Sequence, residues 1–426
     1  MLDIRRLRHE TGAVKEALAK RDLSLSGQVD RVLELDATRR EALATVNDLK
    51  ARRNEDSKRI GEFKRAGGDA EALILAMREV GDQIGELDDT IKSADAEIEA
   101  LLLALPNAPL AEVPQGGEDQ NTVQRCFGEA ATFEFEPRPH WELGEGLGIL
   151  DLPRGAKVSG SGFPVLRAAG ARLQRGLINF FLDVHTSEHG YTEIRVPYLV
   201  TGDAMTGTGQ LPKFSEESYQ TERDELWLIP TAEVPVTNMH RDELLTADDL
   251  PVQYTAYSPC FRREAGAAGK DTRGLLRVHQ FDKVELVRYE LPERSREALE
   301  QLTREAEVLL ERLGLHYRRL LLASGDLGQS GALTYDLEVW APGVAKWLEV
   351  SSCTTFGDYQ ARRANIRFRR SQAEKPEFVH TLNGSALALP RVMAALLETY
   401  QEEDGSVTLP EVLHSYVGSD RLTASS

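Results

Sequence analysis

Cysteine is scarce in this chain of 426 residues, which contains three cysteines and no CxxC pair. Cys126, Cys260 and Cys353 stand far apart, so the pattern predicts neither a disulfide framework nor a structural zinc site. Long apolar runs are also missing, because no stretch approaches the roughly 20 residues needed to cross a bilayer. Residues 1–6 lack the apolar core of a signal peptide. We therefore expect a cytoplasmic protein with no membrane partner.

The charge balance is acidic, with 69 Asp and Glu against 51 Lys and Arg and a formal net charge of -18. A surface of that sign repels a phosphate backbone on average, so general nucleic-acid binding is excluded and any RNA contact is expected to be local. Apolar residues make up 41% of the chain, as is usual in globular proteins. A chain of this length predicts roughly two to three domains.

The N-terminal quarter carries a heptad pattern. Ten positions from 73 to 105 follow the alternating four- and three-residue spacing and all are apolar, and seven of ten such positions from 32 to 63 are apolar. Gly67 and Asp69 lie between the two stretches, where they are suited to ending one helix and capping the next. The pattern predicts an antiparallel hairpin with long helices at about 30–66 and 69–105. At roughly 1.5 Å per residue each helix is about 50 Å long, so we expect the hairpin to project as an arm.

Charge is divided unequally along this predicted arm. Residues 50–66 carry seven bases and three acids, whereas residues 69–105 carry ten acids and two bases. Two interpretations remain open from composition: the cations pair with the acidic helix and solvate the hairpin, or they bind RNA. Beyond the arm, residues 106–119 are rich in proline, glycine and acids, which is typical of a linker. We therefore expect an arm domain at 1–110 and a second domain at 111–426.

The second domain alternates predicted helices and strands. Amphipathic spacing indicates helices at 166–189 and 293–314, the apolar run at 226–229 indicates a strand, and further strands are predicted at 191–197, 336–340 and 347–352. The strand at 226–229 is expected to be buried. It leads into Thr231 and Glu233, which could receive an ammonium group and an alcohol, or could belong to a helix start with Thr231 as N-cap.

The most informative stretch is 261–285. Residues 252–257 before it and 278–289, which overlap its end, alternate in polarity, so the region predicts an antiparallel hairpin with a long loop. The loop and its base contain three glycines, which permit bends, and five cations, which favour an anion. These residues are Gly266, Gly269, Gly274, Arg262, Arg263, Lys270, Arg273 and Arg277. Phe281 at the start of the return strand offers a face for a purine. A solvated basic loop is the alternative interpretation.

Three strings in this stretch, 261–264, 269–275 and 279–285, resemble motif 2 of class II aminoacyl-tRNA synthetases in the form found in the seryl-tRNA synthetase family. Residues 191–197 resemble motif 1 and residues 381–391 resemble motif 3 of the same class. The resemblance covers nearly the whole chain. It implies an α+β fold in which helices flank an antiparallel class II sheet, preceded by a long N-terminal antiparallel coiled-coil arm. It also implies a homodimer, because motif 1 builds the dimer interface in this class.

The resemblance further implies a set of site residues. Arg262, Glu264 and Arg391 are the expected catalytic residues. The expected ATP-binding residues are Arg262, Arg263, Glu264, Arg277, Val278, Phe281, Glu349, Val350, Ser351, Ser352 and Arg391. The expected serine-binding residues are Thr231, Ala232, Glu233, Arg262, Glu285, Asn383 and Ser385. Glu349 and Ser352 are expected to hold the Mg²⁺ that accompanies ATP, since a hard cation beside phosphates takes carboxylate oxygen.

The activity implied by the resemblance is that of a serine--tRNA ligase. Such an enzyme activates L-serine with ATP to seryl-adenylate and transfers serine to tRNA(Ser), with tRNA(Sec) as a further expected substrate. The basic part of the arm would contact the tRNA. Two alternatives remain: a synthetase-like ligase that loads a carrier protein, and a coiled-coil scaffold with a decayed synthetase domain.

Overall fold

The structure is a computed structural model that describes residues 1–265 and 273–424. The chain divides into two compact units, Leu2–Pro106 and Asn107–Ser426, with Met1 counted in the second. This division falls at the start of the predicted linker, a few residues before the expected boundary at 110. Among the helices of the described residues, none combines the length and hydropathy of a membrane span.

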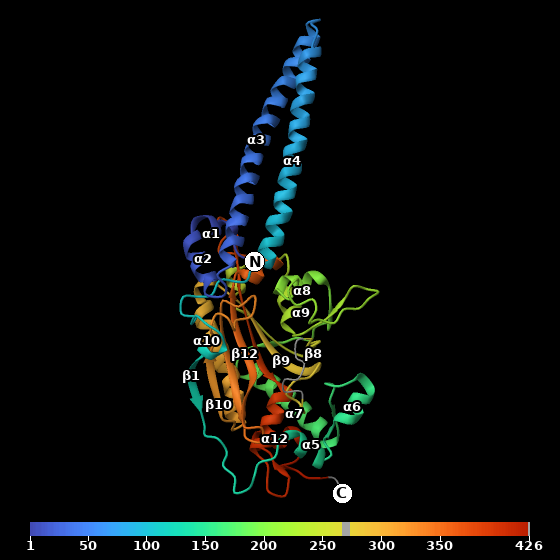
Figure 1. The fold of residues 1–426 in the computed structure, drawn as a ribbon, viewed down its shortest axis with the longest axis vertical. Coiled ribbons are helices and arrows are strands. Elements are labelled where there is room, and N and C mark those ends of the chain that lie inside the picture. The colour runs from blue at the N-terminus through green and yellow to red at the C-terminus, as the bar shows by residue number, and fades with distance from the viewer. Residues whose placement is uncertain (266–272, 425–426) are drawn as a thin grey trace. The chain divides into compact units, whose positions relative to one another are not determined.

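The N-terminal unit is helical, with α1 (Ile4–His9), α2 (Thr11–Ala19), α3 (Leu25–Arg65) and α4 (Glu71–Ala104). Helices α3 and α4 form the expected long hairpin, which Figure 1 shows as two adjacent blue ribbons. The prediction placed the start of the first long helix too late, near residue 30. The heptad pattern arises only where α3 packs against α4. The first turns of α3, which bury Leu25 and Val29, pack near α2 instead and therefore lie outside that pattern.

The second unit is built on a sheet whose order, among the described residues, is β1-β10-β11-β12-β15-β9-β8-β4. All neighbouring pairs are antiparallel except β4 with β8. The strands of this sheet are β1 (Thr122–Phe127), β4 (Thr192–Glu193), β8 (Val252–Phe261), β9 (Gln280–Glu290), β10 (Tyr317–Leu321), β11 (Leu333–Ala341), β12 (Lys346–Gly357) and β15 (His380–Ala388). The predicted α+β class with an antiparallel sheet is confirmed.

Helices α7 (Ala168–Ser187), α10 (Ser295–Arg312) and α12 (Leu389–Thr399) pack on the sheet and share its main hydrophobic core. Successive residues of β12 face opposite sides of the sheet. Thr355 contacts α10, because its Oγ1 lies 2.9 Å from Oγ of Ser295, whereas Ser352 and Thr354 line a cleft. These three helices thus cover one face of the sheet, and the cleft lies on the other.

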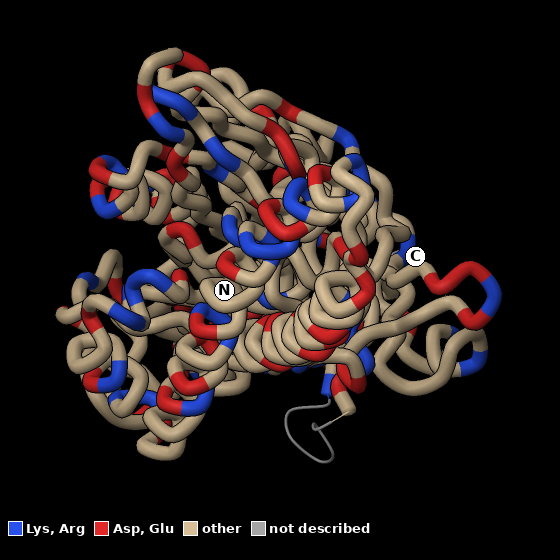
Figure 2. The backbone as a smooth tube through the Cα atoms, turned by 90° about the horizontal axis from the view of Figure 1, so that it is seen from above, with Lys and Arg blue, Asp and Glu red and all other residues tan. Residues whose placement is uncertain are grey.

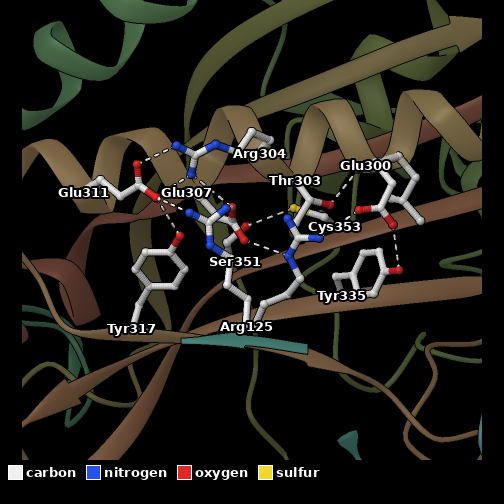
Figure 3. Close-up of polar contacts among 12 residues, drawn as sticks. Arg125, Glu300, Thr303, Arg304, Glu307, Glu311, Tyr317, Tyr335, Ser351 and Cys353 are labelled. Carbon is white, nitrogen blue, oxygen red and sulfur yellow. Dashed lines mark hydrogen bonds and ion pairs between the residues drawn. The ribbon is translucent and has the colours of Figure 1, made fainter. Parts of the chain in front are cut away.

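A buried ion network ties α10 to the sheet edge that ends in β1 (Figure 3). The Glu307 carboxylate is fully buried and accepts hydrogen bonds from Arg125 at 3.0 Å, Arg304 at 3.1 Å and Arg319 at 2.7 Å. Arg125 lies on β1 and Arg319 on β10. Because all three cations also contact other acids, the buried charge is matched, as a buried carboxylate requires.

Two predicted strands are much shorter than expected. The segment 191–197 contributes only β4, and 226–229 contributes only β6 (Trp227–Leu228), which is half-buried and pairs with β5 (Leu199–Val200) outside the main sheet. Pro197 and Pro230 lie at the ends of the two predicted strands, and proline cannot donate to a strand ladder. The strand predicted at 226–229 is thus confirmed only at Trp227–Leu228, and of its expected burial only Ile229 is fully buried.

The remaining elements are short or peripheral. They are α5 (His140–Gly146), β2 (Leu150–Asp151), α6 (Leu152–Ser159), β3 (Val165–Leu166), α8 (Gly202–Thr208), α9 (Glu233–Asn238), β7 (Leu244–Thr246), α11 (Tyr359–Ala364), β13 (Arg367–Arg369), β14 (Glu377–Phe378), β16 (Val407–Thr408), α13 (Glu411–Val417) and β17 (Arg421–Leu422), with single 3₁₀ turns at Glu118–Gln120, Ala247–Asp249 and Pro292–Arg294. The helices predicted at 166–189 and 293–314 are confirmed as α7 and α10, each shorter by two residues at both ends.

Candidate active site

The predicted hairpin is confirmed as β8 and β9, which pair from Val252 with Tyr289 to Phe261 with Gln280. Strand β9 also pairs with β15, and β15 with β12, so residues distant in sequence meet on one surface. Part of the connecting loop, with Gly266, Gly269 and Lys270, lies outside the described residues.

A cleft of about 920 Å³ opens on this surface. Most of the expected site residues line it: Thr231, Glu233, Arg262, Glu264, Arg277, Val278, Phe281, Glu349, Val350, Ser351, Ser352, Asn383, Ser385 and Arg391. The sequence analysis placed arginines from two distant segments, Arg262 and Arg391, in one site, and the structure brings both to the same cleft.

Three expected site residues do not line the cleft. Ala232 is buried in a hydrophobic cluster with Val196 and Val236. The Arg263 guanidinium is turned outward and donates to the carbonyl oxygen of Glu216 at 2.9 Å. Glu285 is fully buried beneath the cleft and forms an ion pair with Lys283, which lines it.

The floor of the cleft contains two carboxylates. Glu285 forms an ion pair with Lys283, whose ammonium also donates to Oγ1 of Thr231 at 3.0 Å. The side-chain amide of Asn383 donates to Glu285 at 2.9 Å and to Glu233 at 3.0 Å. Two acids against one lysine leave a negative charge at the floor when both are ionised, which favours an ammonium ligand.

Burial governs the protonation of both acids. Burial and, after it, the nearby charge of Glu285 raise the pKa of Glu233 to about 7, against the opposing effects of Gln360, Lys283 and Arg262. Burial also raises the pKa of Glu285, while the ion pair with Lys283 opposes that shift. Acids with pKa values raised by burial and by a like charge, inside a cleft, are typical of functional sites.

Thr231 lines the cleft beside the start of α9. Ala232 occupies the N-cap position of that helix, one residue after the position considered for Thr231. The hydroxyl of Thr231 nevertheless accepts from the backbone N–H of Glu233 at 3.2 Å and from Lys283. The hydroxyl oxygen is thereby oriented toward the cleft floor.

One end of the cleft presents guanidinium groups beside an aromatic ring. The Arg262 guanidinium lies 5.1 Å from the ring centroid of Phe281. The Arg277 guanidinium forms an ion pair of 2.5 Å with Glu264, which has a positive φ of 50°. A left-handed backbone costs a non-glycine residue on the order of 1–3 kcal/mol, and such strain clusters at ligand-binding positions.

Arg391 is a second arginine of the cleft, and its guanidinium links α12 to two other segments of the chain. It lies in the first turn of α12 and donates to the carbonyl oxygens of Glu349 at 2.8 Å and Leu276 at 3.2 Å. The positive end of the helix dipole disfavours a cation there unless an anion is close. Glu349 partly supplies that anion, with its carboxylate 3.6 Å from Arg391, and the Arg391 guanidinium remains exposed enough to bind a phosphate.

Asp336 is a cleft residue that the sequence analysis missed. It faces Ser352 across the β11–β12 pair, and its Oδ1 is buried without a hydrogen-bond partner in the described part of the chain. Burial and the neighbouring Glu349 raise its pKa well above the usual range. Within residues 1–265 and 273–424, no three His, Cys, Asp or Glu side chains are arranged to hold a metal ion. Mg²⁺ between phosphates needs only one or two carboxylates, so Glu349 with the unpartnered oxygen of Asp336 fits such an ion.

Other missed residues form one wall of the cleft. They are Thr208, Gly209, Gln210, Phe214, Glu217 and Ser218. No motif marks this segment. Lys283 was also missed, although alternation along a strand puts it on the same face as Glu285 and could have revealed it.

The cations of the helical arm differ in whether they form ion pairs; Figure 2 marks Lys and Arg of the described residues in blue and Asp and Glu in red. Arg31, Arg39 and Lys50 pair across the hairpin with Glu97 at 2.8 Å, Asp95 at 2.9 Å and Asp88 at 3.6 Å. Arg52 and Arg59 share Asp56 at 3.7 and 3.5 Å. In the outer part of α3, residues 50–65, all of which the structure describes, four cations form no ion pair: Arg53, Lys58, Lys64 and Arg65. The solvation interpretation thus accounts for the paired cations, whereas these four remain available to an anion.

Family models cover both units. A model described as "Seryl-tRNA synthetase N-terminal domain" matches residues 1–109, and one described as "tRNA synthetase class II core domain (G, H, P, S and T)" matches residues 214–400. A serine--tRNA ligase of Gemmatimonas aurantiaca is 56% identical over 98% of this chain and 99% of its own length. One of Geobacillus kaustophilus is 54% identical with the same coverage.

Solved structures agree over the full length. A seryl-tRNA synthetase of Pyrococcus horikoshii complexed with ATP superposes with a TM-score of 0.96 at 40% identity, covering 100% of both chains. A cytoplasmic serine-tRNA ligase of Naegleria fowleri in complex with AMP gives a TM-score of 0.89 at 28% identity, covering 100% of this chain and 99% of its own.

Proposed function

Since this chain belongs to the seryl-tRNA synthetase family and has the activity of a serine--tRNA ligase, we propose that the cleft above Glu285 is where serine and ATP react. The observation that supports this proposal most strongly is that Arg262, Arg391 and Thr231 line one cavity from three separate segments, with Glu285 buried beneath them against Lys283. The solved relative from Pyrococcus horikoshii contains ATP, which supports nucleotide binding here.

ATP is proposed to bind with its adenine on Phe281, its α-phosphate on Arg262 and its terminal phosphate toward Arg391. An aromatic face suits a purine, and guanidinium groups bind phosphate in a bidentate manner. Glu264 would accept from the adenine amine. The Mg²⁺ that accompanies ATP would be held by Glu349 and Ser352, with Asp336 beside them, and would supply charge neutralisation for the phosphates.

Serine is proposed to bind on the floor of the cleft, with its ammonium group toward Glu285 and its hydroxyl toward Thr231, Glu233 and Ser385. The negative floor described above supports the ammonium assignment, since Glu233 and Glu285 outnumber Lys283. Polar groups that pair with the serine hydroxyl would be left unsatisfied by alanine, which is rejected by a factor on the order of 10⁴ in sites of this kind.

The reaction needs no protein nucleophile. An oxygen of the serine carboxylate attacks the α-phosphorus, the bond to the bridging oxygen breaks, and pyrophosphate leaves with that electron pair. The terminal ribose hydroxyl of tRNA(Ser) then attacks the carbonyl carbon of seryl-adenylate and AMP leaves. Arg262 would orient the α-phosphate and offset the charge that develops there, so catalysis is orientation and electrostatic stabilisation.

The tRNA is proposed to bind through the outer part of the helical arm. The support is the group of four outer cations that form no ion pair, Arg53, Lys58, Lys64 and Arg65, on an otherwise acidic chain. Double-stranded RNA is recognised mainly by shape and backbone charge. Acceptance of tRNA(Sec) and a cytoplasmic location are further proposals that rest on the family alone.

A homodimer is also proposed. Its support is that β4 ends the main sheet with both of its residues exposed, because an unpaired sheet edge is normally covered by another chain or segment. Loading of a carrier protein is not favoured, because the ligase relatives match the whole chain, including the arm.

The test compares the full chain with a form that lacks residues 1–110, in serine-dependent ATP–pyrophosphate exchange and in transfer of labelled serine to total tRNA. We expect the truncated form to retain exchange and to lose charging. An Arg262→Gln variant should lose exchange, while Arg421→Gln, a matched surface change paired with Asp404, should retain it. Equal charging by both forms would refute the arm proposal, and full exchange by Arg262→Gln would refute the site.

A further inference from the structure

A glutamine outside the cleft contacts a carboxylate inside it. Gln360 lies on α11, is fully buried and does not line the cleft. Its Nε2 donates to Oε1 of Glu233 at 2.6 Å and to the carbonyl oxygen of Thr208 at 3.2 Å. Its Oε1 accepts from the hydroxyl of Thr381 at 2.7 Å. Because the backbone carbonyl of Thr208 can only accept, Nε2 must face it, and the side-chain amide has a single satisfied orientation.

Glu233 is held from two directions. Gln360 bonds one carboxylate oxygen, and Asn383 bonds the other at 3.0 Å. The Asn383 amide also serves Glu285, so Gln360 is the donor dedicated to Glu233. The carbonyl of Thr208 is itself fixed, since it also accepts from the hydroxyl of Ser330 at 3.0 Å. One amide thus links the floor of the cleft to the wall that begins at Thr208.

We propose that Gln360 is a positioning residue for serine: it holds the Glu233 carboxylate in the one orientation that accepts a hydrogen bond from the bound amino acid. This inference rests on the proposed function, in which Glu233 belongs to the serine pocket. Gln360 itself touches no substrate. Its contribution is to fix the rotamer of Glu233 and to favour the ionised, accepting form of the carboxylate.

The charged groups that face Glu233 determine how its protonation, and with it serine binding, depends on pH. Burial and then Glu285 raise the pKa of Glu233, whereas the Gln360 hydrogen bond, Lys283 and Arg262 lower it, and the net value is about 7. The ionised form is the acceptor, so serine binding is complete above this pKa and is lost as the pH falls through it. Without the Gln360 donor the pKa of Glu233 rises further. The loss of serine binding should then begin at a higher pH.

The test uses Gln360→Met, which keeps the side-chain length and removes the donor. Serine and ATP dependence of pyrophosphate exchange are measured on the full chain from about pH 6 to about pH 8.5. We expect KM for serine near neutral pH to rise about tenfold or more, as for loss of a hydrogen bond to a charged group. The pH profile of that KM should move toward alkaline pH. KM for ATP should stay within about twofold of the wild-type value, the scatter of a neutral substitution.

Two further variants separate the possible failures. Glu233→Gln should raise KM for serine and flatten its pH profile; an unchanged KM would refute the pocket assignment itself. If Glu233→Gln has that effect and a folded Gln360→Met does not, the present inference is wrong while the proposed function stands. A joint rise of both KM values without a shift of the profile would indicate a merely structural role and also refute it.

The variant Thr381→Val tests the same inference without changing Gln360, in case Gln360→Met fails to fold. It removes only the hydroxyl that grips Oε1 of Gln360 and leaves the amide in place. We expect a smaller rise of KM for serine in the same direction, and no rise in this variant would count against the inference. Tryptophan fluorescence melts verify that each variant is folded.

Discussion

Replacing Lys283 with methionine would leave Glu285 without its cation at the floor of the cleft. The Lys283 side chain is 6% exposed and that of Glu285 is fully buried. An exposed ion pair contributes about 0–1 kcal/mol, but removing one partner of a buried pair costs about 3–5 kcal/mol because the other charge stays desolvated. Thr231 also loses a donor at 3.0 Å. We therefore expect the free energy of unfolding of residues 107–426 to fall by about 3–5 kcal/mol.

The same substitution should weaken serine binding. Burial raises the pKa of Glu285 and Lys283 is the main opposing influence, so the pKa rises further without it. The carboxyl is then neutral at a higher pH than before and loses its attraction for the serine ammonium. A lost charge-assisted hydrogen bond corresponds to about 1.5–3 kcal/mol, or roughly 10- to 150-fold in kcat/KM for serine.

Urea unfolding followed by tryptophan fluorescence measures the stability change. All four tryptophans, Trp141, Trp227, Trp340 and Trp347, lie in the second unit, so the signal reports that unit alone. The double variant Lys283→Met with Glu285→Gln removes the unpaired charge and should recover part of the loss. A loss below about 1 kcal/mol in the single variant, or no recovery in the double, would refute the reasoning about this pair.

Three other predictions concern separate parts of the molecule. Arg391→Ala should raise KM for ATP in pyrophosphate exchange about 10-fold or more with KM for serine little changed, because a phosphate contact is lost; equal rises would contradict it. Changing Arg53, Lys58, Lys64 and Arg65 together to glutamine should weaken tRNA binding and flatten its dependence on salt, while exchange is unaffected; an unchanged salt slope would argue against the arm contact. Asp36→Ala removes the buried partner of Arg8 at 3.2 Å, Arg39 at 2.9 Å and Arg40 at 3.1 Å. It should lower the stability of the first unit by about 1–3 kcal/mol, seen as an earlier circular dichroism transition with an unchanged tryptophan transition.

The sequence predicted the long elements well, for a physical reason. Helices α3 and α4 repeat the same apolar spacing over many turns, and the β8–β9 hairpin alternates over most of its length. Such repetition outweighs local exceptions. The two-residue strands β4 and β6 are too short to show such repetition.

The site residues that were predicted correctly are those that lie on one strand or within one sequence motif. Alternation also explains the error at Arg263, because successive residues at a strand end point to opposite sides, and its neighbours Arg262 and Glu264 line the cleft. Gln360 carries no such signal. Its partners Thr208, Glu233 and Thr381 are distant in sequence, and only the folded chain brings them to one amide.

The central claim is that one cleft binds both reactants of serine activation. The most direct test is a crystal structure with seryl sulfamoyl adenosine, which is a stable mimic of seryl-adenylate. The account predicts adenine against Phe281, the sulfamoyl group beside Arg262, and the seryl amine within hydrogen-bond distance of Glu285 or Glu233. A mimic bound outside this cleft, or with its seryl group turned away from Thr231, would contradict the account.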